Sequence, residues 1–181
     1  MLRLIGAGNR WRGDDGAGLL VAELVAAARP AGVETIGHGG EPIELIERFA
    51  GARAVWLIDA VRSGAPAGTV HRFDAGERPL PATAFRASTH HIGLAEVVEI
   101  ARALARLPDA VLVFGIEGAC FDTGAPMSAA VTAAAAGLAG QLVEEAARCV
   151  ALLDRRISPP SPRSAAPAGP SGPAALLEAA G

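Results

Sequence analysis

The chain begins with LRLIGAGNRWRGDDGAG at residues 2–18, where an apolar segment leads into glycines and then into two adjacent carboxylates. Residues 2–7 have the length and composition of a buried strand, and residues 16–29 have the apolar periodicity of a helix. A strand, a glycine-rich turn and a helix in this order are typical of an α/β unit. The turn carries Asp14 and Asp15 to the carboxyl end of the strand, where open parallel sheets bind their ligands.

The remaining sequence repeats this alternation of strand and helix. Three more apolar segments of strand length end in turn residues, at 33–37, 54–60 and 110–115. Segments with helical periodicity cover 42–49, 92–107 and the region from Ser128 onwards. Residues 69–73, between Gly- and Pro-rich segments, predict an additional edge strand that could run antiparallel. The sequence therefore predicts an α/β fold of three layers, with a mostly parallel twisted sheet of about five strands and helices on both faces.

The composition divides the chain into a domain and a tail. Residues 1–156 are predicted to form the α/β domain, and Cys149 falls on the apolar face of its last helix. Residues 157–181 are rich in Pro, Ala and Ser, and such a segment cannot bury enough apolar area to order itself. We therefore expect residues 157–181 to be a disordered tail.

Charge and cysteine content exclude several classes of protein. The 181 residues carry 19 acidic and 16 basic side chains, so the sequence predicts no nucleic-acid partner. The two cysteines form no CxxC pair, which argues against a disulfide framework and a thiolate zinc site and favours a cytoplasmic location. Neither a signal peptide nor a membrane-spanning segment is predicted, and Cys120 is expected to pack rather than react.

Three polar clusters follow predicted strands or precede a helix, and they are centred on Asp15, Asp59 and His90. If the first three strands lie in the order 2-1-3, these clusters converge at one edge of the sheet. Two carboxylates and an imidazole suit a divalent ion that has three protein ligands and open positions for another molecule. Ligand type alone leaves nickel, zinc, manganese and iron as alternatives.

Other interpretations of these residues remain open. Asp14 and Asp15 could cap the following helix, and we expect one of the pair to do so while Asp15 points into the site. An Asp that ends a strand, such as Asp59, is often only a turn residue. The Gly6-x-Gly8 sequence invites a dinucleotide-binding interpretation, but Trp11 stands where that motif needs its third glycine.

The other polar residues near these clusters have more ordinary interpretations. Arg10 and Arg12 could position a substrate carboxylate, although salt bridges to the neighbouring aspartates are the safer interpretation. Of the remaining histidines, His91 is expected to be solvated or to support the site indirectly. His38 and His71 are expected to be surface or strand residues.

Five motifs together resemble the nickel-iron hydrogenase maturation endopeptidases over residues 2 to about 150. They are Gly6-x-Gly8-Asn9, Asp14-Asp15-Gly16-x-Gly18, Ile58-Asp59-Ala60, Ser88-Thr89-His90-x-x-Gly93-Leu94 and Phe114-Gly115-Ile116-Glu117. The resemblance implies a five-stranded α/β fold and removal of a C-terminal extension from the hydrogenase large-subunit precursor after nickel insertion. It also implies that Asp15, Asp59 and His90 contact the metal, with Asp15 one methylene shorter than the Glu often found in this family.

The resemblance implies one function and leaves two alternatives. The expected function is that of an endopeptidase, with nickel supplied by the precursor and bound by Asp15, Asp59 and His90, which also serve as the candidate catalytic residues. One alternative is a nickel-dependent checkpoint or chaperone that binds the same precursor without cleaving it. The other is a nucleotide-binding enzyme, which would be stabilised by NAD or flavin. The segment His38-Gly39-Gly40-Glu41-Pro42 loosely resembles the family's substrate-proximal loop.

Overall fold

The computed structural model of the chain describes residues 1–81 and 93–155. The strands are β1 (Leu2–Ala7), β2 (Val33–His38), β3 (Ala54–Val61), β4 (Val70–Asp74) and β5 (Ala110–Glu117). The helices are α1 (Ala17–Ala28), α2 (Pro42–Glu47), α3 (Leu94–Ala103) and α4 (Ala129–Arg155), and a 3-10 turn, η1 (Gly13–Gly16), precedes α1. The predictions that concern His90, His91 and the tail at 157–181 lie outside the described residues.

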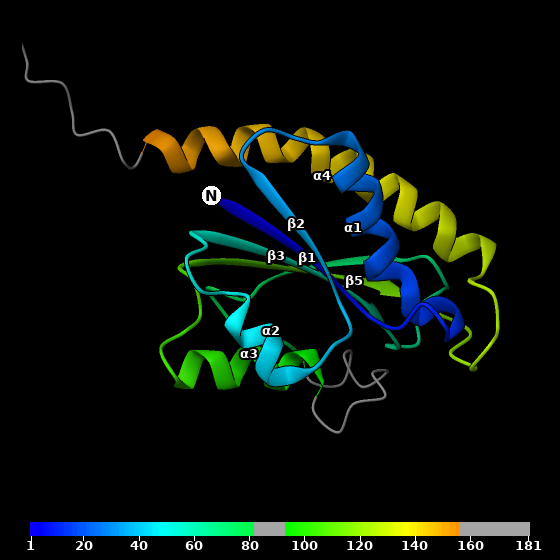
Figure 1. The fold of residues 1–181 in the computed structure, drawn as a ribbon. Coiled ribbons are helices and arrows are strands. Elements are labelled where there is room, and N and C mark those ends of the chain that lie inside the picture. The colour runs from blue at the N-terminus through cyan, green and yellow to red at the C-terminus, as the bar shows by residue number, and fades with distance from the viewer. Residues whose placement is uncertain (82–92, 156–181) are drawn as a thin grey trace, which may run out of the picture.

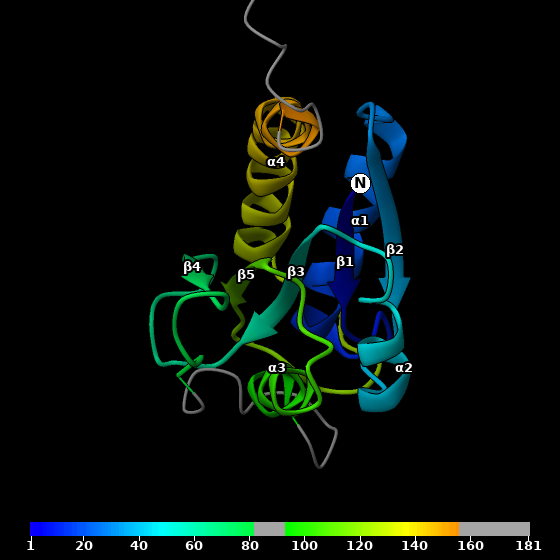
Figure 2. The same ribbon diagram turned by 90° about the vertical axis from the view of Figure 1, so that its left-hand side faces the viewer.

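The strands form one sheet in the order β2-β1-β3-β5-β4. The three inner pairings are parallel, and β4 pairs antiparallel with β5 at the edge. The predicted sheet of about five mostly parallel strands is therefore confirmed, as are the 2-1-3 order and the extra edge strand. In Figures 1 and 2 the helices α1 and α4 cover one face of this sheet, and α2 and α3 cover the other.

The strand β3 lies in the middle of the sheet, and all eight of its residues are buried. Its alternate side chains enter two separate hydrophobic clusters, because successive residues of a strand point to opposite faces. Trp56 and Ile58 pack beneath α1 and α4, whereas Val55 and Leu57 pack against α2 and α3. Apolar residues are thus required on both faces of this strand, and Asp59 is its one polar residue.

The helix α1 begins unusually close to the sheet, which brings η1 to the carboxyl edge of the strands. A Cβ atom on Gly18 would lie 2.3 Å from the carbonyl oxygens of both Ala7 and Ile58. Only glycine allows the first turn of α1 to approach the ends of β1 and β3 in this way. The residues of η1 are therefore held beside the end of β3.

The predicted end of one helix needs correction. The helix α3 ends at Ala103 rather than at residue 107, because Ala105 has a positive φ of 53° and the N–H of Arg106 donates to the carbonyl of Ala101. These contacts terminate a helix with a left-handed residue. Cys149 is half-buried and packs against the hydrophobic cluster beneath α4, as its place on the apolar face of this helix predicts. Among the described residues, no helix has the length and apolar character that crossing a membrane requires.

Candidate functional site

Asp59 is the polar residue of β3 and lies near the carboxyl end of the strand, where only Ala60 and Val61 follow it. Val55, Leu57 and Val61 alternate with it along the strand and pack on the face covered by α2 and α3, so the Asp59 side chain lies on that face. Only 6% of the residue is exposed, and its Oδ1 accepts a hydrogen bond of 2.8 Å from the N–H of Ala60. The predicted carboxylate at the end of this strand is therefore buried.

Asp15 reaches the same edge from η1 and is only 4% exposed. Its backbone N–H donates to the carbonyl of Arg12, and its own carbonyl accepts from the N–H of Asn9, so the turn is closed on both sides. A side chain at Gly8 would collide with the Asp15 carbonyl, since its Cβ would lie 1.9 Å from that oxygen. The loop after β1 thus holds Asp15 in one place through its backbone.

The two carboxylates influence each other. Burial, first, and the negative charge of Asp15, second, raise the pKa of Asp59 to about 7, while the hydrogen bond from Ala60 opposes the rise. Two buried acids close together have two ways to avoid unbalanced charge, which are to retain a proton or to bind a cation. Their oxygen atoms are suitable ligands for a divalent ion, so these residues fit the metal that the sequence predicts.

The third predicted ligand, His90, lies outside the described residues. Within residues 1–81 and 93–155 no three His, Cys, Asp or Glu side chains are grouped as a metal site would require. The structure therefore brings Asp15 and Asp59 together and leaves the contribution of His90 a prediction. The described chain resumes at Gly93, which is the N-cap residue of α3.

Asp14 has a different role from the helix cap proposed for it. Its Oδ2 accepts hydrogen bonds of 2.8 and 3.0 Å from the N–H groups of Ala119 and Cys120, and its Oδ1 accepts one of 2.7 Å from Ser128. Burial opposes ionisation, but these hydrogen bonds leave the pKa of Asp14 below its ordinary value. The helix α1 has Gly16 at its N-cap and no side-chain cap. Asp14 instead ties η1 to the loop between β5 and α4.

Glu117, at the end of β5, is a buried acid to which the sequence assigned no role. Its carboxylate accepts hydrogen bonds from the N–H and hydroxyl of Ser63 and from the N–H of Gly64, at 2.7 to 2.8 Å. Burial would raise the pKa of Glu117, but these hydrogen bonds lower it overall. His71 Nε2 lies 3.4 Å from Glu117 Oε2. Since Ser63 is distant in sequence, only the Phe114–Glu117 motif could have drawn attention to this residue.

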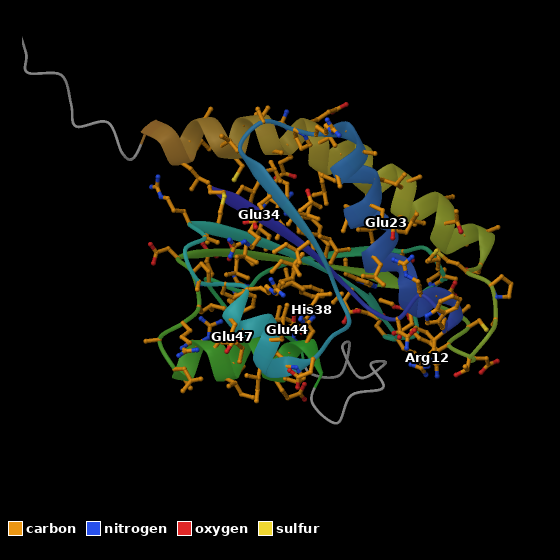
Figure 3. All side chains as sticks on the ribbon, viewed as in Figure 1. Arg12, Glu23, Glu34, His38, Glu44 and Glu47 are labelled. Atoms are coloured by element: carbon orange, nitrogen blue, oxygen red, sulfur yellow. The ribbon has the colours of Figure 1, made fainter. Side chains whose placement is uncertain are left out.

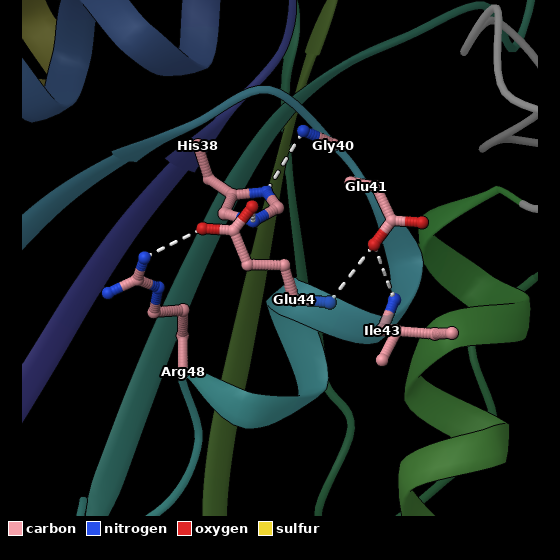
Figure 4. A network of polar contacts seen from close by, with 6 residues as sticks. All are labelled: His38, Gly40, Glu41, Ile43, Glu44 and Arg48. Atoms are coloured by element: carbon pink, nitrogen blue, oxygen red, sulfur yellow. Dashed lines mark hydrogen bonds and ion pairs between the residues drawn. The ribbon is translucent and has the colours of Figure 1, made fainter.

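His38 ends β2 as a strand residue, but it is buried, so the surface alternative is wrong. Its Nδ1 accepts a hydrogen bond of 2.9 Å from the N–H of Gly40, and its Nε2 lies 3.6 Å from Glu44 Oε2 (Figure 4). The same Glu44 accepts a hydrogen bond from Arg48, and Glu41 caps α2 through the N–H groups of Ile43 and Glu44. The loop that follows β2 is therefore fastened to α2.

The two arginines of the first loop have different partners. Arg12 Nη1 lies 3.4 Å from Asp15 Oδ2, which confirms a salt bridge to a neighbouring aspartate. Arg10 instead forms an exposed ion pair of 2.7 Å with Glu23, so the same prediction is wrong for Arg10. Figure 3 shows Arg12 at the turn before α1 and Glu23 farther along that helix.

Comparison with known proteins relates this site to one family. Residues 19–145 match the model of the HycI family, described as hydrogenase maturation protease. The hydrogenase expression/formation protein HupD of Thiocapsa roseopersicina is 29% identical over 116 residues, which cover 63% of this chain and 52% of that protein. The chain thus spans about half the length of this curated relative.

Solved structures show the same fold. The [NiFe] hydrogenase maturation protease HycI from Thermococcus kodakarensis superposes with a TM-score of 0.64 at 22% identity, covering 79% of this chain and 90% of that one. The endopeptidase HycI from Escherichia coli gives 0.61 at 24% identity, covering 80% and 90%. The family match extends over more than half of the sequence, and the motifs at Ile58–Ala60 and Phe114–Glu117 lie within the matched residues. The chain belongs to the hydrogenase maturation protease family.

Proposed function

We propose that this chain is an endopeptidase that removes the C-terminal extension of a nickel-iron hydrogenase large-subunit precursor after nickel insertion. The observation that carries the proposal is the meeting of two buried carboxylates, Asp15 and Asp59, at the carboxyl edge of the sheet. The family's name, and the names of its solved relatives as maturation proteases and endopeptidases, support the reaction class. The reaction is proposed to take place in the cytoplasm.

Nickel enters this proposal as part of the substrate. The precursor's cysteines hold the ion, which docks against Asp15, Asp59 and His90 and so places the scissile peptide bond. With a pKa of about 7, Asp59 carries a proton in much of the metal-free protein at neutral pH. A docking cation favours the ionised carboxylate, so docking is expected to release that proton. A bound metal can also polarise a carbonyl or activate water.

The test is a processing assay on two forms of the same precursor. Purified protein is incubated with nickel-loaded and with metal-free precursor, and loss of the extension is followed by mass spectrometry. Cleavage of the nickel-loaded form alone is expected. Equal cleavage of both forms, or of neither, contradicts the proposal. Formation of a nickel-dependent complex without loss of mass would instead favour the non-cleaving checkpoint.

Substitutions of Asp59 and His90 test whether these residues are needed for cleavage. Asp59→Asn and His90→Ala are expected to abolish processing. Asp109→Asn makes the same chemical change as Asp59→Asn at an exposed position just before β5, at the opposite edge of the sheet, and is expected to cleave normally. Full activity of either site variant would overturn the assignment of that residue.

A further inference from the structure

Arg12 lies in the loop after β1, and its guanidinium group points toward Asp15. Its side chain is 19% exposed, and its Nη1 lies 3.4 Å from Oδ2 of Asp15, one of the two candidate ligand acids. Arg10, two residues earlier, has a side chain that is 59% exposed and pairs with Glu23 instead. The two arginines belong to the same loop, but of the two only Arg12 places its positive charge beside Asp15 at the proposed metal-binding edge.

We infer that Arg12 makes the site selective for a metal whose charge is already balanced by thiolates, by keeping free divalent ions away from Asp15 and Asp59. This inference rests on the proposed function and adds a role for a residue to which the reaction itself gives none. The pair of acids alone would attract any dication. A free metal ion that binds to Asp15 and Asp59 must either displace the Arg12 guanidinium or bind next to its positive charge.

Free nickel and thiolate-bound nickel differ in the net charge that they bring to Arg12. A free nickel ion brings two positive charges next to the guanidinium, and this repulsion is weakly screened because Asp15 and Asp59 are nearly buried. Nickel bound by cysteine thiolates brings the negative charge of its own ligands, which a guanidinium attracts. Arg12 therefore opposes the first binding event and not the second.

The inference is tested by titrating the metal-free full-length protein with Ni²⁺ in a calorimeter. Arg12→Gln is expected to bind free Ni²⁺ at least about tenfold more tightly than the wild type, because a positive charge a few ångströms from the ion is removed. Arg12→Lys keeps the charge and is expected to behave like the wild type. Arg10→Gln removes the same charge from the same loop and is expected to stay within about twofold of the wild type, since its partner is Glu23.

Two results would overturn the inference at this stage. One is an unchanged or weaker Ni²⁺ affinity in Arg12→Gln, and the other is an equal gain in Arg10→Gln, which would indicate an effect of net charge alone. Adding Asp59→Asn to Arg12→Gln is expected to abolish the gain. If the double variant keeps the increased Ni²⁺ affinity, the ion binds at a site that does not include Asp59, and this result would also contradict the inference.

A second measurement separates this inference from the proposed function. Processing of nickel-loaded precursor by Arg12→Gln is expected to be inhibited at a free Ni²⁺ concentration about tenfold lower than the wild type requires. If the wild type cleaves the precursor and both proteins are equally sensitive to free Ni²⁺, the inference fails while the proposed function stands. If neither protein cleaves but Arg12→Gln still gains affinity for free Ni²⁺, the proposed function fails and the exclusion of free ions by Arg12 stands.

Discussion

Asp59 is buried in a strand whose other residues are nearly all apolar, and its charge is therefore opposed by its surroundings. Its pKa of about 7 in the folded protein compares with 3.8 for an ordinary aspartate. Between these two values the unfolded chain releases a proton that the folded chain retains. The contribution of Asp59 to the stability of the metal-free protein therefore falls as the pH rises from about 4 to 7, and the penalty remains above pH 7.

Asp59→Asn is predicted to stabilise the metal-free protein at pH 8, by on the order of 2 to 4 kcal/mol, because the amide carries no charge to bury. The gain should shrink toward pH 4, where the wild-type carboxyl is protonated in the folded protein and begins to be protonated in the unfolded chain as well. Urea unfolding at pH 4.5 and pH 8 measures the difference. Asp109→Asn, at an exposed position, serves as control, and a less stable Asp59→Asn protein at pH 8 would contradict this explanation.

Glu117 shows the opposite case, a buried acid whose charge is satisfied. Glu117→Gln is predicted to lower the free energy of unfolding by about 2 to 3 kcal/mol at pH 7, since an amide cannot accept all the hydrogen bonds from Ser63 and Gly64. Urea denaturation measures the loss. Glu144→Gln makes the same change at an exposed position in the middle of α4 and should change stability by less than about 0.5 kcal/mol. Equal effects of the two substitutions would contradict the assigned role of Glu117.

At the scale of the element, glycine has different consequences in two helices. In α1, a Cβ atom on Gly18 would collide with the carbonyl oxygens of Ala7 in β1 and Ile58 in β3, whereas in α4 nothing lies within 4 Å of the position of a Cβ atom on Gly137. The first glycine allows helix and sheet to approach. The second only lowers the helical propensity of α4.

Alanine substitutions at these positions should therefore have opposite signs. Gly18→Ala is predicted to lower stability by more than about 2 kcal/mol, because α1 must move away from the sheet and carry η1 with it. Gly137→Ala is predicted to raise stability by about 0.5 to 1 kcal/mol. Thermal and urea unfolding of the two variants measure both effects. If Gly18→Ala is tolerated as well as Gly137→Ala, the close packing of α1 is not needed to form the site.

At the scale of the whole molecule, β3 joins the two hydrophobic clusters into one structure. Because Ile58 and Leu57 are neighbours in the strand but belong to opposite clusters, neither face of the sheet can lose its packing while the other retains it. We therefore predict one cooperative unfolding transition. Trp56 is buried and Trp11 is exposed, so a Trp11→Phe protein reports core unfolding through Trp56 fluorescence alone.

The measurement compares that fluorescence with far-ultraviolet circular dichroism during urea unfolding. The two midpoints are expected to coincide in the Trp11→Phe protein. Ile58→Val and Leu57→Val change one residue in each cluster. Each should lower the free energy of unfolding by about 1 kcal/mol, and both signals should report the same loss. Separate transitions, or a variant that shifts only one signal, would show that the faces unfold independently.

The amino-acid sequence alone determined the strands, their parallel arrangement and the family. The tendency of apolar residues to be buried can be recognised from the residues and their spacing, so mainly apolar segments such as 54–60 identify a strand without knowledge of its partners. The same local signals placed Asp15 and Asp59 at strand ends. They missed the last residues of β3 and β5, because Val61 and Glu117 gain their strand conformation by pairing with each other.

Only the tertiary structure decided what the polar side chains do. Asp14 bonds to residues more than 100 positions away, and His38 is buried because α2 folds over it, so no local pattern could distinguish a helix cap from a tie between loops or a surface histidine from a buried one. Arg10 and Arg12 are equivalent in sequence, yet only one of them reaches Asp15. The physical reason is that an ion pair or hydrogen bond depends on which two groups meet in space, whereas hydrophobic burial depends mainly on the residue itself.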